Sequence, residues 1–373
     1  AKKVSGNIHN LTARETREIP KGMSEKHKKT SVNFVEQFGS LIDDAFLTID
    51  GDLTIKEING ACIKLLGENL IGSSLSDKLI YNNLHKEVET SITSDSIIEF
   101  STTPKINKYR HMIGRILPLS DDRLAVLLMD MTLQHNIEKM RRDFVANVSH
   151  ELRSPLTSLL GFVETMRNNL EMEQNVRENF LKIMDEEANR MSRLIDDLLS
   201  LSRVEIEEHI APSGQVSVKE AVKSAIDALA YRANTSKHKI EFNDVRKNTE
   251  QTSRIRGDLD EIIEVFHNLL DNALKYSYPS TTIDVSLSED QTGNLVLAIK
   301  NNGDGIDEKH IPRLTERFYR VDKGRSRQMG GTGLGLAIVK HIINKHRGQL
   351  FIRSKPKHET VFEVHLPYFS DPN

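Results

Sequence analysis

The segment 133–210 constrains the fold most, because it contains one proline and one glycine in an otherwise uninterrupted helical pattern. Apolar residues recur there at steps of three or four, the period of a helix with one buried face. They form two stripes: Leu133, Ile137, Met140, Phe144, Val148 and Leu152, and then Met184, Ala188, Met191, Ile195, Leu198 and Leu201. The polar residues 167–174 separate the stripes, so the segment predicts a helical hairpin. Since one hairpin cannot bury both stripes, we expect two chains to complete a four-helix bundle as a homodimer.

The sequence changes character on both sides of this hairpin. Residues 1–30 are polar and predict a linker or juxtamembrane stub. Residues 31–132 combine short β-prone runs, turn signals and two helix-like pieces, which predicts a small α+β unit with an antiparallel sheet. Residues 212–369 alternate predicted helices and strands as a mixed α/β sandwich. The expected fold class is therefore multidomain α+β, with the hairpin of 133–210 between two domains that contain sheets.

Composition excludes several classes of protein. The single cysteine, Cys62, cannot form a disulfide within the chain or supply a cysteine-rich zinc site. A formal charge of −3 gives no overall attraction for nucleic acid, which we do not expect as a partner. No apolar run approaches the roughly 20 residues of a membrane-spanning helix, so we expect a cytoplasmic portion without a span. Because the chain begins at Ala1 rather than Met, the possibility of a membrane anchor upstream of Ala1 is left open.

One histidine of the hairpin stands out by its position on the predicted helix. His150 lies two residues from both Val148 and Leu152 of the first stripe, so it points about 200° away from the buried face, toward water. A neutral imidazole can act as a nucleophile, while the neighbouring carboxylate of Glu151 orients the ring or accepts its proton. We expect Pro155 to bend the helix just past this site. Taken alone, an ordinary surface histidine is the simpler interpretation, since the chain contains 14.

Two short motifs in the C-terminal segment suit the binding of a nucleotide. Asn268 and Asn272 share one face of a predicted helix that also carries Lys275, and amide oxygens suit a hard ion such as Mg²⁺ that holds phosphates. Residues 301–306, Asn-Asn-Gly-Asp-Gly-Ile, follow an apolar strand, and their glycines let the backbone approach a flat ring closely. Taken singly, these motifs also fit a solvated helix face and a turn.

Two further motifs follow in the same segment. Residues 314–322 lead into a stretch with Lys323, Arg325 and Arg327, and such a basic loop could fold over a polyphosphate, although a solvated loop fits it as well. Residues 330–336, Gly-Gly-Thr-Gly-Leu-Gly-Leu, open a predicted helix whose unpaired N–H groups form an anion site. A dinucleotide-binding loop is excluded, because the strand and the acidic residue that it needs are absent from the surrounding sequence.

The residues from His150 to Leu156, His-Glu-Leu-Arg-Ser-Pro-Leu, resemble the phospho-acceptor box of sensor histidine kinases, where His-Glu-Leu-Arg-Thr-Pro-Leu is usual. The resemblance implies that His150 is phosphorylated and that Glu151 is the general base. The residue four places after the histidine commonly positions water for dephosphorylating the partner protein. Ser154 stands there instead of threonine and keeps a hydroxyl for that chemistry.

The four C-terminal motifs, in this order after an acceptor box, resemble the nucleotide-binding boxes of the histidine-kinase catalytic domain, the Bergerat ATP-binding fold. The resemblance implies ATP and Mg²⁺ as cofactors, with Asn272 as the metal ligand. It implies that Asn268, Lys275 and Arg320 reach phosphates and that Gly303 and Gly305 line the adenine pocket. The full set of implied nucleotide contacts is Asn268, Asn272, Lys275, Tyr276, Asn301, Gly303, Gly305, Ile306, Phe318, Arg320, Gly331, Thr332, Gly333, Leu334, Gly335 and Leu336.

One position departs from the histidine-kinase family and keeps an alternative open, and another distinguishes this chain from other relatives of the fold. The family has aspartate at Asn301, where a carboxylate accepts from the adenine amine, so we expect looser ATP binding. A non-catalytic dimeric signalling scaffold is therefore one alternative. Gyrase-like ATP hydrolases carry a glutamate four residues before the metal-binding asparagine, but Asn268 stands there and is no base. Transfer to a histidine is accordingly favoured over transfer to water.

The remaining resemblances concern the N-terminal region and the type of kinase. Residues 31–132 resemble a PAS sensor domain, in which His85 and His111 are weak candidates for ligands. The string from Ile311 to Lys323, followed by residues 330–345, is similar to sensor kinases of the phosphate-regulon type. This similarity implies a response regulator of the PhoB type as partner, phosphate-starvation signalling, and anchoring in a bacterial inner membrane through an upstream segment.

Overall fold

The computed structural model describes residues 39, 41–119, 122–169, 171–246, 254–322, 324 and 329–369. It divides into two compact units, Ala1–Asp143 and Phe144–Asn373. The predicted stub of residues 1–30 and the basic residues Lys323, Arg325 and Arg327 lie outside the described residues. No helix among the residues described is both long and apolar enough to cross a membrane.

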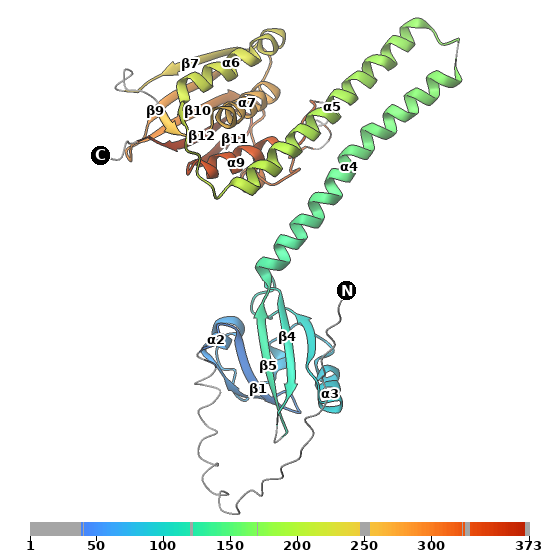
Figure 1. Cartoon of the computed structure of the whole chain (residues 1–373), viewed down its shortest axis with the longest axis vertical. Coiled ribbons are helices and arrows are strands. Elements are labelled where there is room, and N and C mark those ends of the chain that lie inside the picture. Colours follow the sequence, from blue (N-terminus) through green and yellow to red (C-terminus); the bar gives the residue numbers. More distant parts are fainter. Residues whose placement is uncertain are drawn as a thin grey trace, which may run out of the picture. The chain divides into compact units, whose positions relative to one another are not determined.

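The first unit is built on one antiparallel sheet with the order β2-β1-β5-β4-β3 (Figure 1). Its strands are β1 (Ala45–Asp50), β2 (Ile55–Ile58), β3 (Ile98–Thr102), β4 (Met112–Pro118) and β5 (Arg123–Asp130). Its helices are α2 (Gly60–Leu66), the 3₁₀ turn η1 (Leu75–Asp77) and α3 (Leu84–Ser94). The Asp50 carboxylate accepts from the Thr54 N–H at 2.8 Å and closes the β1–β2 turn. The α+β prediction is confirmed for these residues, and a PAS assignment stays a prediction.

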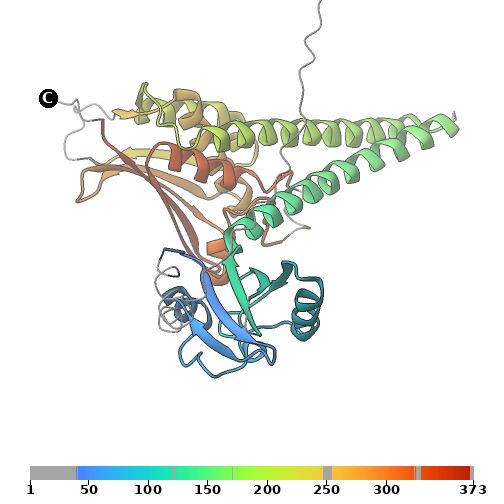
Figure 2. The same cartoon turned by 60° about the horizontal axis from the view of Figure 1, so that its bottom comes forward.

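Two long helices form the predicted hairpin. Helix α4 spans Thr132–Asn168 and passes from the first unit into the second, and α5 spans Gln174–Glu207. Figure 2 shows them meeting at the short connection and diverging away from it. Pro155 lies within α4 and does not end it. The loss of one backbone hydrogen bond there is tolerated inside a helix of 37 residues.

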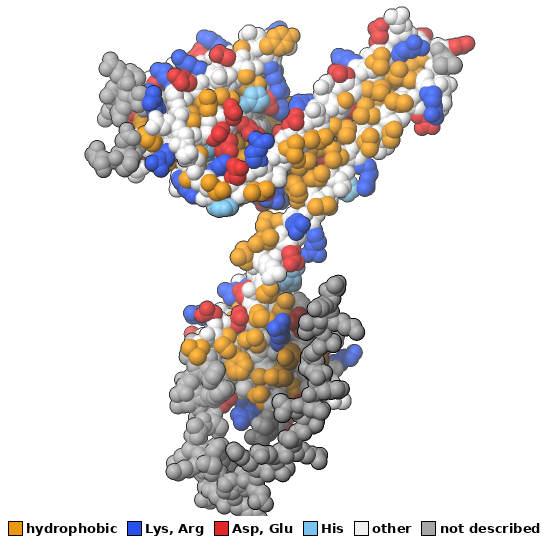
Figure 3. All heavy atoms as spheres, viewed as in Figure 1, with side chains coloured by type: hydrophobic (Ala, Val, Ile, Leu, Met, Phe, Trp, Pro, Cys, Tyr) orange, Lys and Arg blue, Asp and Glu red, His pale blue; other side chains and the backbone are white. Residues whose placement is uncertain are grey.

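The apolar residues of the hairpin divide between two environments. Leu194, Leu201 and Val204 of α5 are buried in the core of the second unit, where α9 packs against α5. The prediction that Leu201 belongs to the dimer stripe therefore needs correction, because this side chain faces the sheet-containing domain. Figure 3 shows a hydrophobic face along the hairpin. Exposed apolar side chains of α4 and α5 include Val145, Leu156, Leu160, Val163, Leu181, Ile195 and Leu199. A second copy of the chain remains the predicted cover for that face.

The rest of the second unit is a sheet with helices packed on it. The sheet order is β11-β12-β10-β9-β7, with β7 parallel to β9 and the other pairs antiparallel. The strands are β7 (Lys239–Asp244), β9 (Thr282–Glu289), β10 (Asn294–Asn302), β11 (Gln349–Lys355) and β12 (Glu359–Pro367). The helices are α6 (Val218–Thr235), α7 (Leu259–Tyr276), the 3₁₀ segment η2 (Glu308–Arg313) and α9 (Gly335–Lys345). The predicted mixed α/β sandwich is confirmed.

Alternation along the strands explains the core of this domain. Ile283, Val285 and Leu287 of β9 are fully buried, and the residues between them are not. They belong to the same buried cluster as Phe266 and Leu270 of α7. A short pair of strands, β6 (Gln215–Ser217) and β8 (Arg254–Arg256), was not predicted, because three residues are too few to reveal an alternating pattern.

Candidate nucleotide site and phospho-acceptor helix

A cavity of about 450 Å³ opens between α7, the end of β10, the segment after η2 and the start of α9. Most of the predicted nucleotide contacts line it. They are Asn268, Asn272, Lys275, Tyr276, Asn301, Gly305, Ile306, Arg320, Gly331, Thr332, Gly333, Gly335 and Leu336. These residues come from four motifs, and the first and last of them, Asn268 and Leu336, are 68 positions apart in the chain. The fold therefore brings the four separate motifs together around one cavity.

One wall of the cavity is the polar face of α7. Asp258 caps this helix by accepting the Glu261 N–H at 3.1 Å, and the opposite face of the helix is buried against the sheet. Asn268, Asn272 and Lys275 are thereby presented to the cavity as the periodicity predicted. Lys275 forms an ion pair of 2.6 Å with Asp271, one turn earlier. The wall therefore offers two amides and a cation to a ligand with phosphate groups.

The adenine end of the predicted site lies at the end of β10. Asn301 is 4% exposed, lines the cavity and pairs in register with Thr360 of β12. Gly305 has φ +67° and would place a Cβ 2.4 Å from the Lys355 carbonyl oxygen, so only glycine fits. Gly303 does not line the cavity. A Cβ there would meet the Tyr276 carbonyl oxygen at 2.1 Å, so the structure assigns Gly303 to the packing of β10 on the end of α7.

The glycine-rich segment before α9 forms another side of the cavity. Gly333 has φ +78° and accepts the Phe318 N–H at 2.8 Å, which ties this segment to the chain after η2. Helix α9 begins at Gly335 with no side-chain cap, so its first N–H groups are available to an anion. Phe318 and Leu334 are not among the lining residues. Phe318 packs on the ring of Phe144 with centroids 5.9 Å apart, and Leu334 is fully buried in the core.

The acceptor residues lie on α4, in the same unit as the cavity but outside its lining. His150 and Ser154 are exposed, as the helical pattern predicted. The Glu151 carboxylate accepts from Arg190 of α5 at 3.0 Å and from Arg320 at 3.2 Å. Since Arg320 lines the cavity, Glu151 connects the acceptor helix directly to the nucleotide site.

Several lining residues belong to no motif that the sequence offers, and Arg193, Asp197 and Glu264 are among them. Arg193 and Asp197 come from α5, and Glu264 lies one turn before Asn268 on α7. The Asp197 carboxylate accepts from the Thr332 hydroxyl at 2.6 Å, and Glu264 accepts from Ser200 at 2.7 Å. Burial raises the pKa of both carboxyl groups above the ordinary value. No local signal identifies them, because their position depends on how α5 packs against the domain.

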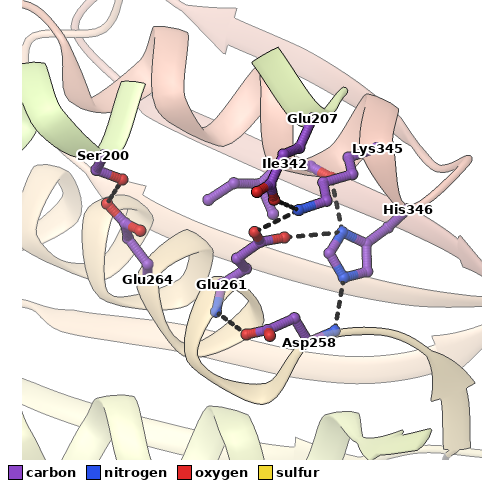
Figure 4. Close-up of polar contacts among 8 residues, drawn as sticks. All are labelled: Ser200, Glu207, Asp258, Glu261, Glu264, Ile342, Lys345 and His346. Atoms are coloured by element: carbon purple, nitrogen blue, oxygen red, sulfur yellow. Dashed lines mark hydrogen bonds and ion pairs between the residues drawn. The ribbon is translucent and has the colours of Figure 1, made fainter. Parts of the chain in front are cut away.

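A buried polar cluster lies behind the site, where the end of α5 meets α7 and α9 (Figure 4). Lys345 donates to Glu207 at 2.8 Å and to Glu261 at 2.7 Å. Burial would lower the pKa of Lys345, but these two carboxylates outweigh it and raise the pKa. His346 accepts the Asp258 N–H at 3.1 Å through Nε2, and burial lowers its pKa. The cluster fixes the N-terminus of α7, and thus the polar face of that helix, relative to α5.

Comparison with known proteins assigns these parts to families. Residues 140–207 match the His Kinase A (phospho-acceptor) domain. Residues 257–369 match the family of histidine kinase-, DNA gyrase B- and HSP90-like ATPases. The second match covers α7, β9 to β12 and α9, which form most of the cavity wall.

Several curated and solved proteins are similar over long stretches. The phosphate regulon sensor protein PhoR of Pseudomonas aeruginosa is 33% identical over 367 residues, covering 97% of this chain and 79% of that protein. The sensor protein kinase WalK of Staphylococcus epidermidis is 32% identical over 376 residues, and the chain spans 58% of its length. The solved histidine kinase AdeS of Acinetobacter baumannii is 24% identical, with a TM-score of 0.47 over 59% of this chain and 98% of that chain.

The similarity to PhoR extends across both units, and the two domain matches contain the acceptor helix and the nucleotide cavity described above. The domain matched at 257–369 binds ATP in its family, and the matched acceptor domain carries His150. The chain belongs to the sensor histidine kinases of two-component systems.

Proposed function

We propose that this chain transfers the γ-phosphoryl group of Mg·ATP to His150 and then to an aspartate of a response regulator. The observation that carries the proposal is the joint presence, in one unit, of a cavity lined by the four nucleotide motifs and an exposed histidine in an acceptor box. The proposed domains are a stub at 1–30, a PAS-like sensor at 31–132, a dimerisation and phosphotransfer hairpin at 133–210, and a catalytic domain at 212–369.

The lining residues suit ATP with a divalent cation. Amide oxygens of Asn272 and Asn268 are hard donors, while Lys275, Arg320 and the start of α9 suit phosphate oxygens. Among the described residues there is no group of three or more histidine, cysteine or acidic side chains that could hold a metal by itself. This fits a cation held jointly by Asn272 and the substrate phosphates, where it would neutralise charge on the phosphates.

The chemistry at the acceptor needs an unprotonated ring nitrogen. The lone pair of one His150 nitrogen attacks the γ-phosphorus, the bond to the bridging oxygen breaks, and ADP leaves. The proton on the other ring nitrogen passes to the Glu151 carboxylate, which neutralises the developing imidazolium. In the second transfer an aspartate oxygen of the regulator attacks the same phosphorus and the N–P bond breaks. The exposed Ser154 hydroxyl would position water for dephosphorylating the regulator.

A labelling experiment tests this function. The full chain is incubated with γ-labelled ATP and Mg²⁺, and we expect acid-labile label that His150→Ala abolishes. His209→Ala is the matched control, because His209 is an exposed histidine of the same unit that lies outside the acceptor box. Label that persists in His150→Ala would contradict the proposal. Rapid phosphate release without labelled protein would favour the ATP-hydrolase alternative, and failure to bind nucleotide would favour the scaffold alternative.

The finer assignments rest on similarity to PhoR. They are a regulator of the PhoB type, phosphate-starvation signalling, a homodimer through the exposed face of the hairpin, and an inner-membrane anchor upstream of the chain. Incubating the labelled chain with a panel of purified regulators tests the first assignment. Fastest transfer to a PhoB-type regulator supports it, and faster transfer to another regulator contradicts it.

A further inference from the structure

Two residues that line the nucleotide cavity, Arg320 and Thr332, are hydrogen-bonded to carboxylates of the helical hairpin. Arg320 donates to the Glu151 carboxylate of α4 at 3.2 Å, and the same nitrogen donates to the Thr332 carbonyl oxygen at 2.6 Å. The Thr332 hydroxyl donates to the Asp197 carboxylate of α5 at 2.6 Å. Arg320 and Thr332 are therefore joined to each other, and each is bonded to a different helix of the hairpin.

These contacts are enclosed rather than superficial. The Arg320 side chain is 4% exposed and the Glu151 side chain 18%. Burial raises the pKa of Asp197, while the Thr332 hydroxyl and the charge of Lys275 oppose that rise. Shielded ion pairs and hydrogen bonds of this kind are stronger than exposed ones, because water competes less for the same groups.

We infer that the docked hairpin and the phosphates of Mg·ATP compete for Arg320 and Thr332. The inference rests on the proposed function, since it concerns regulation of the same site. A carboxylate and a phosphate are both oxyanions, and a guanidinium or a hydroxyl donates to either of them. Glu151 and Asp197 thus occupy donors that face the cavity, and the charge of Asp197 also opposes an incoming polyphosphate.

The competition makes the two halves of the reaction depend on each other. By linkage, a nucleotide that draws Arg320 and Thr332 to its phosphates weakens the hold of the hairpin on the catalytic domain, and the docked hairpin weakens nucleotide binding by the same factor. Glu151 exchanges its contact with Arg320 but keeps Arg190, whose donor lies 3.0 Å away on α5. The general base beside His150 is therefore engaged by Arg320 until nucleotide arrives.

Binding of a non-hydrolysable ATP analogue tests the competition separately from phosphotransfer. Mg²⁺ with AMP-PNP is titrated calorimetrically into the full chain and into Asp197→Asn. We expect about fivefold tighter binding in the variant, because a hydrogen bond to a charged acceptor is stronger than one to a neutral acceptor. Asp196→Asn is the matched control, since Asp196 is the exposed neighbour on the same helix and its loss changes the charge equally. Equal affinities of the two variants would overturn the inference.

A double variant ties the effect to the contact itself. Thr332→Val removes the hydroxyl, so the gain from Asp197→Asn should be smaller in the Thr332→Val background than in the otherwise unaltered chain, where only the effect of the Asp197 charge remains after the hydroxyl is lost. A full gain there would also overturn the inference. Glu151→Gln should tighten analogue binding as well, although it impairs phosphotransfer. If the unaltered chain binds no nucleotide, the proposed function itself fails, whereas normal binding with an inert Asp197→Asn defeats only the competition.

Discussion

Gly335 offers a substitution that separates nucleotide binding from stability. An alanine Cβ at this position would lie 2.7 Å from Oδ1 of Asn268, which is too close for any contact. That oxygen is the far end of a rotatable side chain, so we expect the amide to turn aside while the backbone stays in place. Gly335 is also the first residue of α9, where alanine is a better helix former than glycine.

The two effects have opposite signs and can be estimated. Helix propensity favours alanine by up to about 1 kcal/mol, which would raise the melting temperature by about 2–4 °C in a unit of this size. A hydrogen bond from the Asn268 amide to a charged phosphate contributes about 1.5–3 kcal/mol. Its loss weakens nucleotide binding by about 10- to 100-fold.

Calorimetric titration with Mg²⁺ and AMP-PNP, together with thermal unfolding, measures both effects on Gly335→Ala. Gly161→Ala on α4 is the matched control, because no atom lies within 4 Å of its added Cβ apart from its chain neighbours and the adjacent backbone of its own helix. The control should gain helix stability and keep full affinity. Unchanged affinity in Gly335→Ala would refute the reasoning, and so would a loss of affinity that parallels a fall in melting temperature.

Three other substitutions test the surroundings of the site. Lys345→Met leaves the Glu261 carboxylate, which is 13% exposed, without its cation and should cost about 3 kcal/mol in chemical denaturation. The exposed Lys340→Met should cost little, and equal losses in the two variants would contradict the role assigned to the cluster. The raised pKa of Asp197 means that the folded state retains a proton that the unfolded chain releases, so the stability contributed by this group falls as the pH rises through that interval. Asp197→Asn should therefore flatten the fall in unfolding free energy above about pH 4, and an unaltered pH profile would count against it. Asn301→Asp should bind Mg·AMP-PNP several-fold more tightly through a charge-assisted bond to the adenine amine, while Asn302→Asp, outside the cavity lining, should not.

Much of the molecule could be predicted from local patterns. A helix was predicted from the sequence at the residues that form α7, and the predicted helix placed Asn268 and Asn272 on one face, which lines the cavity. The apolar strand predicted before residues 301–306 is β10, and Gly305 of that motif adopts the positive φ that glycine allows. Each of these features follows from interactions between residues a few positions apart, so the sequence alone carries them.

Other features depended on how distant elements pack. Leu201 has the helical period of the predicted dimer stripe, yet it is buried in the core that α5 shares with the catalytic domain. Periodicity shows which residues share one face of a helix, but it does not show which element covers that face. The contact of Glu151 with Arg320 joins residues 169 positions apart, and that of Asp197 with Thr332 joins residues 135 apart. A charged side chain shows its chemistry in the sequence, but only the tertiary structure decides which opposite charge or hydroxyl it meets.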